Sequence, residues 1–143
     1  MASAGSDGNV FFWNVKNANE PSPNELQGKN PHANEEVTSI SWNSIFDSIS
    51  ASCSAEGLCV IWELKENKNV LKFSNQQRRS DSSIAWNPEV GTELAVSSQT
   101  DNASVIEIWD LRKAYAPVKE LKGHAEGILS LSWCPDDANL LLS

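Results

Sequence analysis

The side chains with the greatest potential for metal binding or nucleophilic chemistry are His32, His124, Cys53, Cys59 and Cys134. A structural zinc site needs four ligands at close spacing. The three cysteines form no C-x-x-C pair, and they lie far from both histidines in the sequence. An odd number of cysteines also argues against a disulfide framework. We therefore expect no metal site, and we expect the cysteines to be buried free thiols.

The carboxylates form small clusters that do not have the pattern of a catalytic pair. Asp136-Asp137 lies in a predicted turn, whereas Glu35-Glu36 and Asp81 fall in predicted loops, so we expect all of them to be solvated. The sequence contains no G-x-S-x-G elbow, no phosphate-binding glycine-rich loop and no H-E-x-x-H pair. These observations predict no catalytic residue, no cofactor and no enzymatic activity.

The charge of the chain argues against two further classes of partner. Its 143 residues include 11 Lys and Arg against 19 Asp and Glu, which gives a net charge of −8. Nucleic acid and anionic lipid both require clustered basic residues, and the basic pair Arg78-Arg79 is predicted to lie in a solvated loop. The first residues lack the basic and apolar regions of a signal peptide, and no apolar run is long enough to span a bilayer. We expect a cytosolic chain without direct membrane insertion.

Six tryptophans recur at regular spacing, and this spacing indicates which structural elements the chain contains. Taken alternately they form two series, one with steps of 49 and 47 residues and the other with steps of 44 and 47. A period of this length is typical of a repeat architecture. The first series is Trp13, Trp62 and Trp109, and the second is Trp42, Trp86 and Trp133.

Short apolar segments around the tryptophans predict β-strands. The first series follows β-branched and aromatic residues, and the second follows a serine, a large aliphatic residue and a small residue. Another apolar segment lies nine residues after each tryptophan of the second series, and a fourth strand is predicted at 70–73 and 118–121, with a weaker copy at 25–27. Asp7-Gly8 and Glu56-Gly57 are predicted to form hairpin turns. Each repeat is therefore predicted to contain four antiparallel strands.

Several of these strands are apolar on both faces, which predicts sheets that are covered on both sides. Four-stranded sheets stacked around an axis form a β-propeller. The predicted fold is all-β, a propeller segment of two complete four-stranded blades with a partial blade at each end. The complete blades are predicted at 36–75 and 81–122, the end of a blade at 1–30 and the start of another at 123–143. This set cannot close a ring of four to eight blades, so we expect part of a larger propeller.

The repeats resemble those of the WD-repeat family. Trp109-Asp110 matches the Trp-Asp pair of that family, Trp13-Asn14 and Trp62-Glu63 are degenerate copies, and Gly123-His124 matches the Gly-His pair that opens a repeat. In this family the histidine binds an aspartate in a hairpin turn and is linked to a serine or threonine and to the tryptophan. The resemblance implies that His124 is structural rather than a general base, with its aspartate partner beyond Ser143. It places Asp7 and Glu56 in the turn position, and His32 near the position of the Gly-His histidine.

A closer resemblance appears over residues 78–143. The segments 83–90, 105–112, 127–135 and 140–143, together with a long turn at 99–104, are similar to the propeller of the large outer-shell subunit of the COPII vesicle coat. The turn adds specificity because Ser97 and Trp109 are 12 residues apart, against 10 between Ser52 and Trp62. Residues 1–77 fit the same propeller more loosely.

This resemblance implies a non-enzymatic scaffold in transport from the endoplasmic reticulum to the Golgi. It implies a cytoplasmic protein that is peripheral on endoplasmic reticulum exit sites and on the vesicle coat. The implied partners are neighbouring coat propellers and, through parts outside this chain, the smaller propeller subunit of the outer coat. One alternative is another WD-repeat adaptor in a multi-subunit assembly, and a second is a propeller enzyme with a polar cluster on the ring axis.

Overall fold

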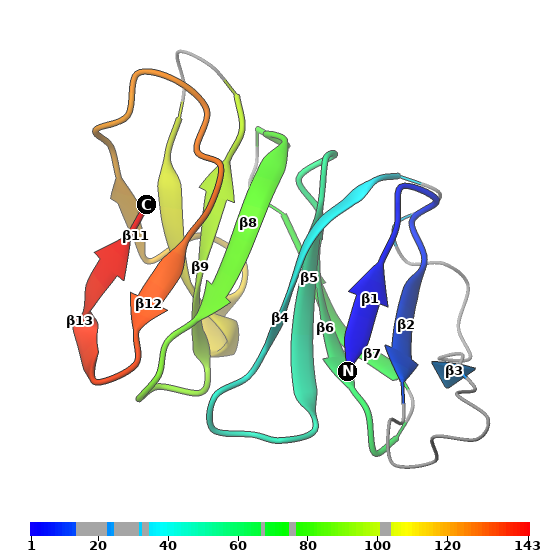
Figure 1. The fold of residues 1–143 in the computed structure, drawn as a ribbon. Coiled ribbons are helices and arrows are strands. Elements are labelled where there is room, and N and C mark those ends of the chain that lie inside the picture. The colour runs from blue at the N-terminus through cyan, green and yellow to red at the C-terminus, as the bar shows by residue number, and fades with distance from the viewer. Residues whose placement is uncertain (14–22, 25–31, 33–34, 67, 75–76, 101–103) are drawn as a thin grey trace.

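The computed structural model describes residues 1–13, 23–24, 32, 35–66, 68–74, 77–100 and 104–143, and their regular structure is almost entirely β (Figure 1). The first sheet has the order β1-β2-β3 and the last has the order β12-β13. Two four-stranded sheets lie between them, β4-β5-β6-β7 and β8-β9-β10-β11. All paired strands are antiparallel. The prediction of an all-β propeller segment with two complete sheets and a partial sheet at each end is confirmed.

The strands follow the predicted apolar segments closely. The partial sheets contain β1 (Ala2–Ala4), β2 (Val10–Trp13), β3 (Pro23–Asn24), β12 (Ser132–Cys134) and β13 (Asp137–Leu142). The second sheet contains β4 (Val37–Trp42), β5 (Ile49–Ser54), β6 (Cys59–Glu63) and β7 (Lys68–Phe73). The third contains β8 (Asp81–Trp86), β9 (Glu93–Ser98), β10 (Ile106–Asp110) and β11 (Lys119–Leu121), with the short 3-10 helix η1 (Leu111–Lys113) after β10. The strand predicted at 25–27 lies outside the described residues.

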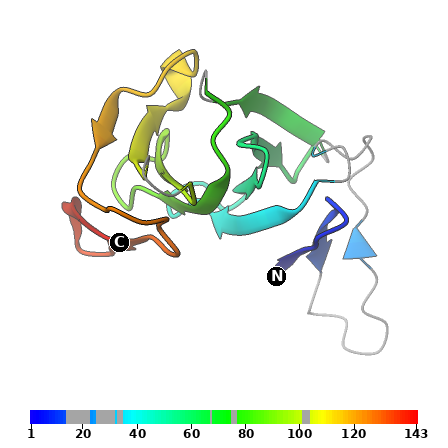
Figure 2. The same cartoon turned by 90° about the horizontal axis from the view of Figure 1, so that it is seen from above.

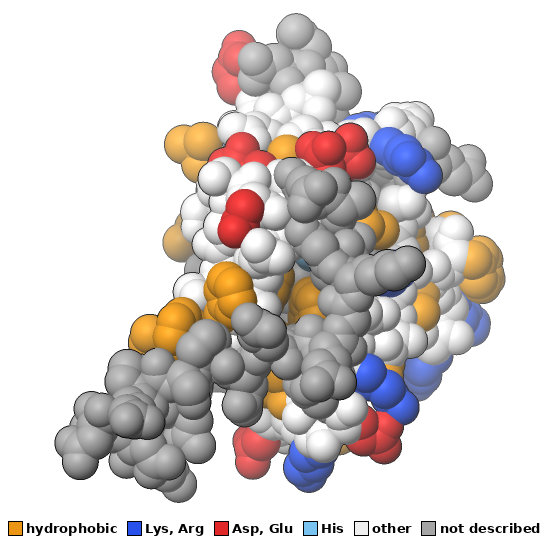
Figure 3. All heavy atoms as spheres, turned by 90° about the vertical axis from the view of Figure 1, so that its right-hand side faces the viewer, with side chains coloured by type: hydrophobic (Ala, Val, Ile, Leu, Met, Phe, Trp, Pro, Cys, Tyr) orange, Lys and Arg blue, Asp and Glu red, His pale blue; other side chains and the backbone are white. Residues whose placement is uncertain are grey.

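The sheets follow one another in chain order around the molecule (Figure 2). Neighbouring sheets touch through their first strands, since β4 contacts both β1 and β8, and β8 contacts β12. Hydrophobic side chains also reach the surface on the side of the first sheet (Figure 3). The chain therefore has the arrangement expected of successive propeller blades.

Three apolar layers separate the four sheets, and the middle strands contribute to two layers each. In β6, Val60 and Trp62 pack toward the first sheet, whereas Cys59 and Ile61 pack toward the third. In β10, Trp109 faces the second sheet, where its ring centroid lies 4.7 Å from that of Phe73. Because apolar side chains are buried on both faces, each complete sheet depends on its neighbours for its core.

The strand registers confirm the repeat and correct one detail of it. Ala51, Ala95 and Leu142 have equivalent places, opposite Ser41, Ala85 and Ser132. However, Ser97 pairs with Ile106 as Cys53 pairs with Cys59, so Ser97 matches Cys53 and not Ser52. These pairs are nine and six positions apart, and the turn after β9 is therefore three residues longer than the turn after β5, not two.

The turn after β5 contains a glycine that its backbone requires. Gly57 has a φ of +72°, and a Cβ at this position would overlap the backbone of Arg79, just before β8. Gly8 has the equivalent place after β1, with a φ of +76°. Both residues confirm the predicted hairpin turns, since this region of backbone conformation favours glycine.

Candidate functional site

A buried polar link joins His32, Ser52 and Trp62 in the second sheet. The Nε2 atom of His32 lies 2.8 Å from the hydroxyl of Ser52, and the indole N–H of Trp62 donates to the same hydroxyl at 2.9 Å. All three side chains are buried. Burial, together with the charge of Lys72, lowers the pKa of His32 to about 4. The link therefore holds a neutral imidazole and fastens the segment before β4 to the two middle strands.

The same link recurs in part at both ends of the chain. In the last sheet His124 Nε2 lies 2.7 Å from the hydroxyl of Ser143, which follows Leu142 as Ser52 follows Ala51. In the first sheet the indole N–H of Trp13 donates to Ser3 at 2.8 Å. The serine was absent from the residues predicted for the site. The sequence does carry a signal for this serine, because Ser3 and Ser52 each lie ten residues before a tryptophan of the first series.

The third sheet replaces this link with an ion pair. Val96 has the register position of Ser52 and offers no hydroxyl, and the indole N–H of Trp109 donates to Glu107 at 3.0 Å instead. Glu107 is 5% exposed, and its carboxylate lies 3.5 Å from a guanidinium nitrogen of Arg79. The prediction of a solvated Arg79 is therefore wrong, because its side chain is only 15% exposed and meets a buried carboxylate.

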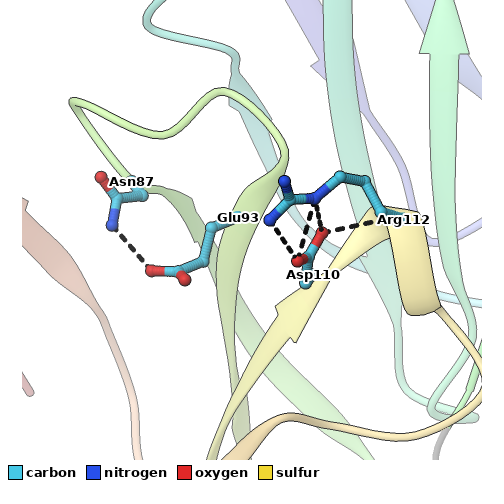
Figure 4. A network of polar contacts seen from close by, with 4 residues as sticks. All are labelled: Asn87, Glu93, Asp110 and Arg112. Carbon is cyan, nitrogen blue, oxygen red and sulfur yellow. Dashed lines mark hydrogen bonds and ion pairs between the residues drawn. The ribbon is translucent and has the colours of Figure 1, made fainter.

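The aspartate of the Trp-Asp pair binds within its own turn (Figure 4). Asp110 accepts hydrogen bonds from the backbone N–H of Arg112 at 3.0 Å and from the guanidinium of the same residue at 2.6–3.1 Å. These hydrogen bonds lower the pKa of Asp110 to about 2. In the neighbouring hairpin the amide of Asn87 donates to Glu93 at 2.7 Å. Asp110 thus caps η1 and fixes the turn between β10 and β11.

The second tryptophan series lies on the strands that join neighbouring sheets. Trp86 is buried, and its indole N–H donates to the backbone carbonyl of Ser41 in the second sheet at 3.1 Å. Trp42 is 40% exposed and packs edge-on against Phe12 of the first sheet. Trp133 donates to the carbonyl of Ala138 within its own hairpin. Of the three, only Trp86 has an indole hydrogen bond that crosses to the preceding sheet.

Two further predictions about polar residues are wrong. Asp81 is not solvated: it begins β8, is 5% exposed, and accepts a hydrogen bond from the thiol of Cys59 at 3.4 Å. Burial raises its pKa to about 8. Cys53 and Cys59 are buried free thiols as predicted, but Cys134 is only half-buried. The contacts of Asp81 come from residues distant in sequence, so its own neighbours gave no sign of its burial.

The described residues offer no metal-binding cluster, and the groove along the inner strands offers no titratable group. No group of three or more His, Cys, Asp or Glu among them is placed to hold a metal ion. A groove runs along β4, β8 and β12, and its lining of serine, aliphatic, proline and tryptophan side chains contains no titratable group. A Cβ added at Gly123 would meet no atom within 4 Å. Nε2 of His124 lies within hydrogen-bond distance of the Ser143 hydroxyl. No helix in the described part of the chain is long and apolar enough to cross a membrane.

Comparisons with known proteins agree with this geometry. The WD domain, G-beta repeat family matches residues 115–143. Over 144 aligned residues the whole chain is 39% identical to Protein transport protein Sec31B of Mus musculus and 38% identical to Protein transport protein SEC31 of Dictyostelium discoideum. It spans only 12% and 11% of the length of these relatives.

Solved structures show the same fold in a vesicle coat. A chain of "COPII on membranes, outer coat vertex" superposes with a TM-score of 0.88 at 34% identity, over 98% of this chain and 39% of that one. "The structure of the COPII coat assembled on membranes" gives the same score and identity and covers 22% of its chain. The chain is thus a WD-repeat β-propeller segment and a homologue of the Sec31 protein transport proteins along its whole length.

Proposed function

We propose that the chain is a scaffold segment of the COPII outer coat, acting in protein transport from the endoplasmic reticulum to the Golgi. The observation that carries this proposal is the combination of full-length similarity to the Sec31 proteins with superposition on a chain of the outer coat vertex at a TM-score of 0.88. A rigid stack of sheets with loops at both rims suits a protein that holds other proteins in place.

The same comparison supports protein partners within the coat. We assign neighbouring coat propellers to this chain, and the smaller propeller subunit of the outer coat to parts outside it. The proposed location is the cytoplasmic surface of endoplasmic reticulum exit sites and of the vesicle coat. The coat structures assembled on membranes support a peripheral position, and the net charge of −8 is consistent with protein rather than nucleic acid partners.

A structural role for the repeat residues, without enzymatic activity, is part of the proposal. The indole N–H groups of Trp13 and Trp62 and the imidazole of His32 bind serine hydroxyls of neighbouring strands, and the groove lining offers no titratable group. We infer that the blades span 36–75 and 81–122, with partial blades at 1–30 and 123–143. The residues proposed to be structural are Trp13, Trp42, Trp62, Trp86, Trp109, Asp110, Gly123, His124 and Trp133.

Recruitment to assembled coats tests the proposal. The tagged chain is incubated with liposomes that carry a complete COPII coat, with liposomes that carry only the inner coat, and with bare liposomes, and each sample is floated on a density gradient. The expected result is recovery of the chain with the complete coat alone. Recovery that does not depend on the outer coat, or no recovery from any sample, would contradict the proposal. Stable association with a different multi-subunit complex in cell extracts would favour the alternative WD-repeat adaptor.

A further inference from the structure

Two neighbouring hairpin loops present large apolar side chains to solvent at one end of the molecule. The loop between β4 and β5 covers residues 43–48, and the loop between β8 and β9 covers residues 87–92; both lie at the lower end in Figure 1. Ile45 is 43% exposed, Phe46 is 49% exposed and Val90 is 40% exposed. We call these three residues the hairpin-loop patch.

The two loops hold each other in a fixed conformation. Asn43 donates to the carbonyl of Gly91 at 2.8 Å, and Ser44 donates to the carbonyl of Asn87 at 2.9 Å. The ring of Phe46 lies so close to Gly91 that a Cβ there would be 2.6 Å from a ring carbon. The two loops are therefore in direct contact.

Each loop is also fastened internally by an asparagine. The side-chain oxygen of Asn43 accepts from the backbone N–H groups of Ile45 and Phe46, and that of Asn87 accepts from those of Glu89 and Val90. The apolar side chains are thus displayed on an ordered backbone. A partner that docks here would not need to order the loops, which reduces the entropic cost of binding.

The charged residues within the two loops are of one sign. The two loops contain Asp47 and Glu89, both exposed, and contain no lysine or arginine. Within the described part of the chain neither carboxylate forms an ion pair. A complementary partner therefore combines large apolar side chains with lysine or arginine. A second copy of this chain, with a net charge of −8, would be repelled.

We propose that the hairpin-loop patch docks a short basic segment of a partner protein through one or two large apolar side chains. The apolar side chain of the partner packs against Phe46, and its neighbouring lysine or arginine side chains lie against Asp47 and Glu89. The inference deepens the proposed scaffold role, on which it rests. The docking is tested without coat proteins. Peptide docking can therefore fail while recruitment to the coat succeeds, and recruitment can fail while docking succeeds.

The probe is a random octapeptide display library selected on the immobilised full chain. The expected result is enrichment of peptides that contain at least one Leu, Ile or Phe together with two or more Lys or Arg. The most enriched peptide is then labelled, and its dissociation constant is measured by fluorescence anisotropy. No enrichment, or enrichment of acidic or uncharged peptides, would overturn the proposal. Concentration-dependent self-association of the chain that Phe46→Ser abolishes would also overturn it, because the occupant would be a second copy.

Variants with matched controls locate the binding site. Phe46→Ser and Val90→Ser should each weaken binding of the selected peptide about tenfold, whereas Val70→Ser, at a 49% exposed position on β7, should change it less than twofold. Glu89→Lys should weaken binding severalfold, and Glu36→Lys, an exposed carboxylate before β4, should not.

Far-UV circular dichroism checks that each variant is folded. If Phe46→Ser unfolds the chain, Val90→Ser and Glu89→Lys decide the outcome. Unchanged affinity in both of these folded variants would refute docking at this patch.

Discussion

Replacing the serine of the buried link tests how strongly that link holds the second sheet together. The hydroxyl of Ser52 has two buried partners, His32 Nε2 at 2.8 Å and the indole N–H of Trp62 at 2.9 Å. Ser52→Ala removes this hydroxyl and leaves both partners buried without it. A buried polar group that loses its partner costs about 1–3 kcal/mol. With two groups affected, we expect the free energy of unfolding to fall by about 2–6 kcal/mol.

The assay is urea unfolding at pH 7, followed by tryptophan fluorescence and far-UV circular dichroism. The matched control is Ser50→Ala, at an equally buried position on the same strand, where the hydroxyl makes one hydrogen bond of 3.2 Å to the carbonyl of Ser41. The control should lose about 1 kcal/mol. If Ser52→Ala costs no more than Ser50→Ala, the link does not stabilise the sheet and the reasoning is refuted.

Two further predictions concern a turn and the dependence of stability on pH. Gly57→Ala should destabilise the chain by about 1–3 kcal/mol in the same urea assay, because it places a Cβ at positive φ against the backbone of Arg79. Between pH 4 and 8 the folded chain retains a proton on Asp81 that the unfolded chain releases near pH 4, so stability is lost as the pH rises toward 8. The lowered pKa of His32 acts in the opposite direction, since its contribution is complete above pH 6.5 and is lost as the pH falls toward 4. We therefore expect the free energy of unfolding to fall by roughly 2 kcal/mol between pH 6.5 and 8, and Asp81→Asn to abolish this fall and to lose stability below pH 6.5 instead. An unchanged fall in Asp81→Asn would show that another group causes it.

The strands and their stacking could be predicted from the sequence because the signals for them are local. Apolar residues on both faces of β2 and β6, with glycine at the turns that need positive φ, are visible within ten residues of each tryptophan. The spacing of the two tryptophan series then indicated how the sheets repeat. The fold was predictable because the same local pattern occurred in each copy.

The polar contacts between sheets were less predictable. Asp81 and Arg79 looked like loop charges because their partners, Cys59 and Glu107, are distant in the sequence. The third sheet also departs from the repeat, since Val96 replaces the serine of the link and the turn after β9 is three residues longer than the turn after β5. Burial of a charged side chain depends on which strands face each other, and a single repeat does not contain that information.

The most direct test of the stacked-sheet architecture is a nuclear Overhauser measurement on the uniformly labelled chain. The indole N–H of Trp86 donates to the carbonyl of Ser41 in the preceding sheet. We therefore predict cross-peaks between the indole proton of Trp86 and backbone protons of β4. Backbone cross-peaks between β7 and β8, with none from this indole to β4, would instead indicate one continuous sheet and would contradict the propeller segment on which the scaffold role depends.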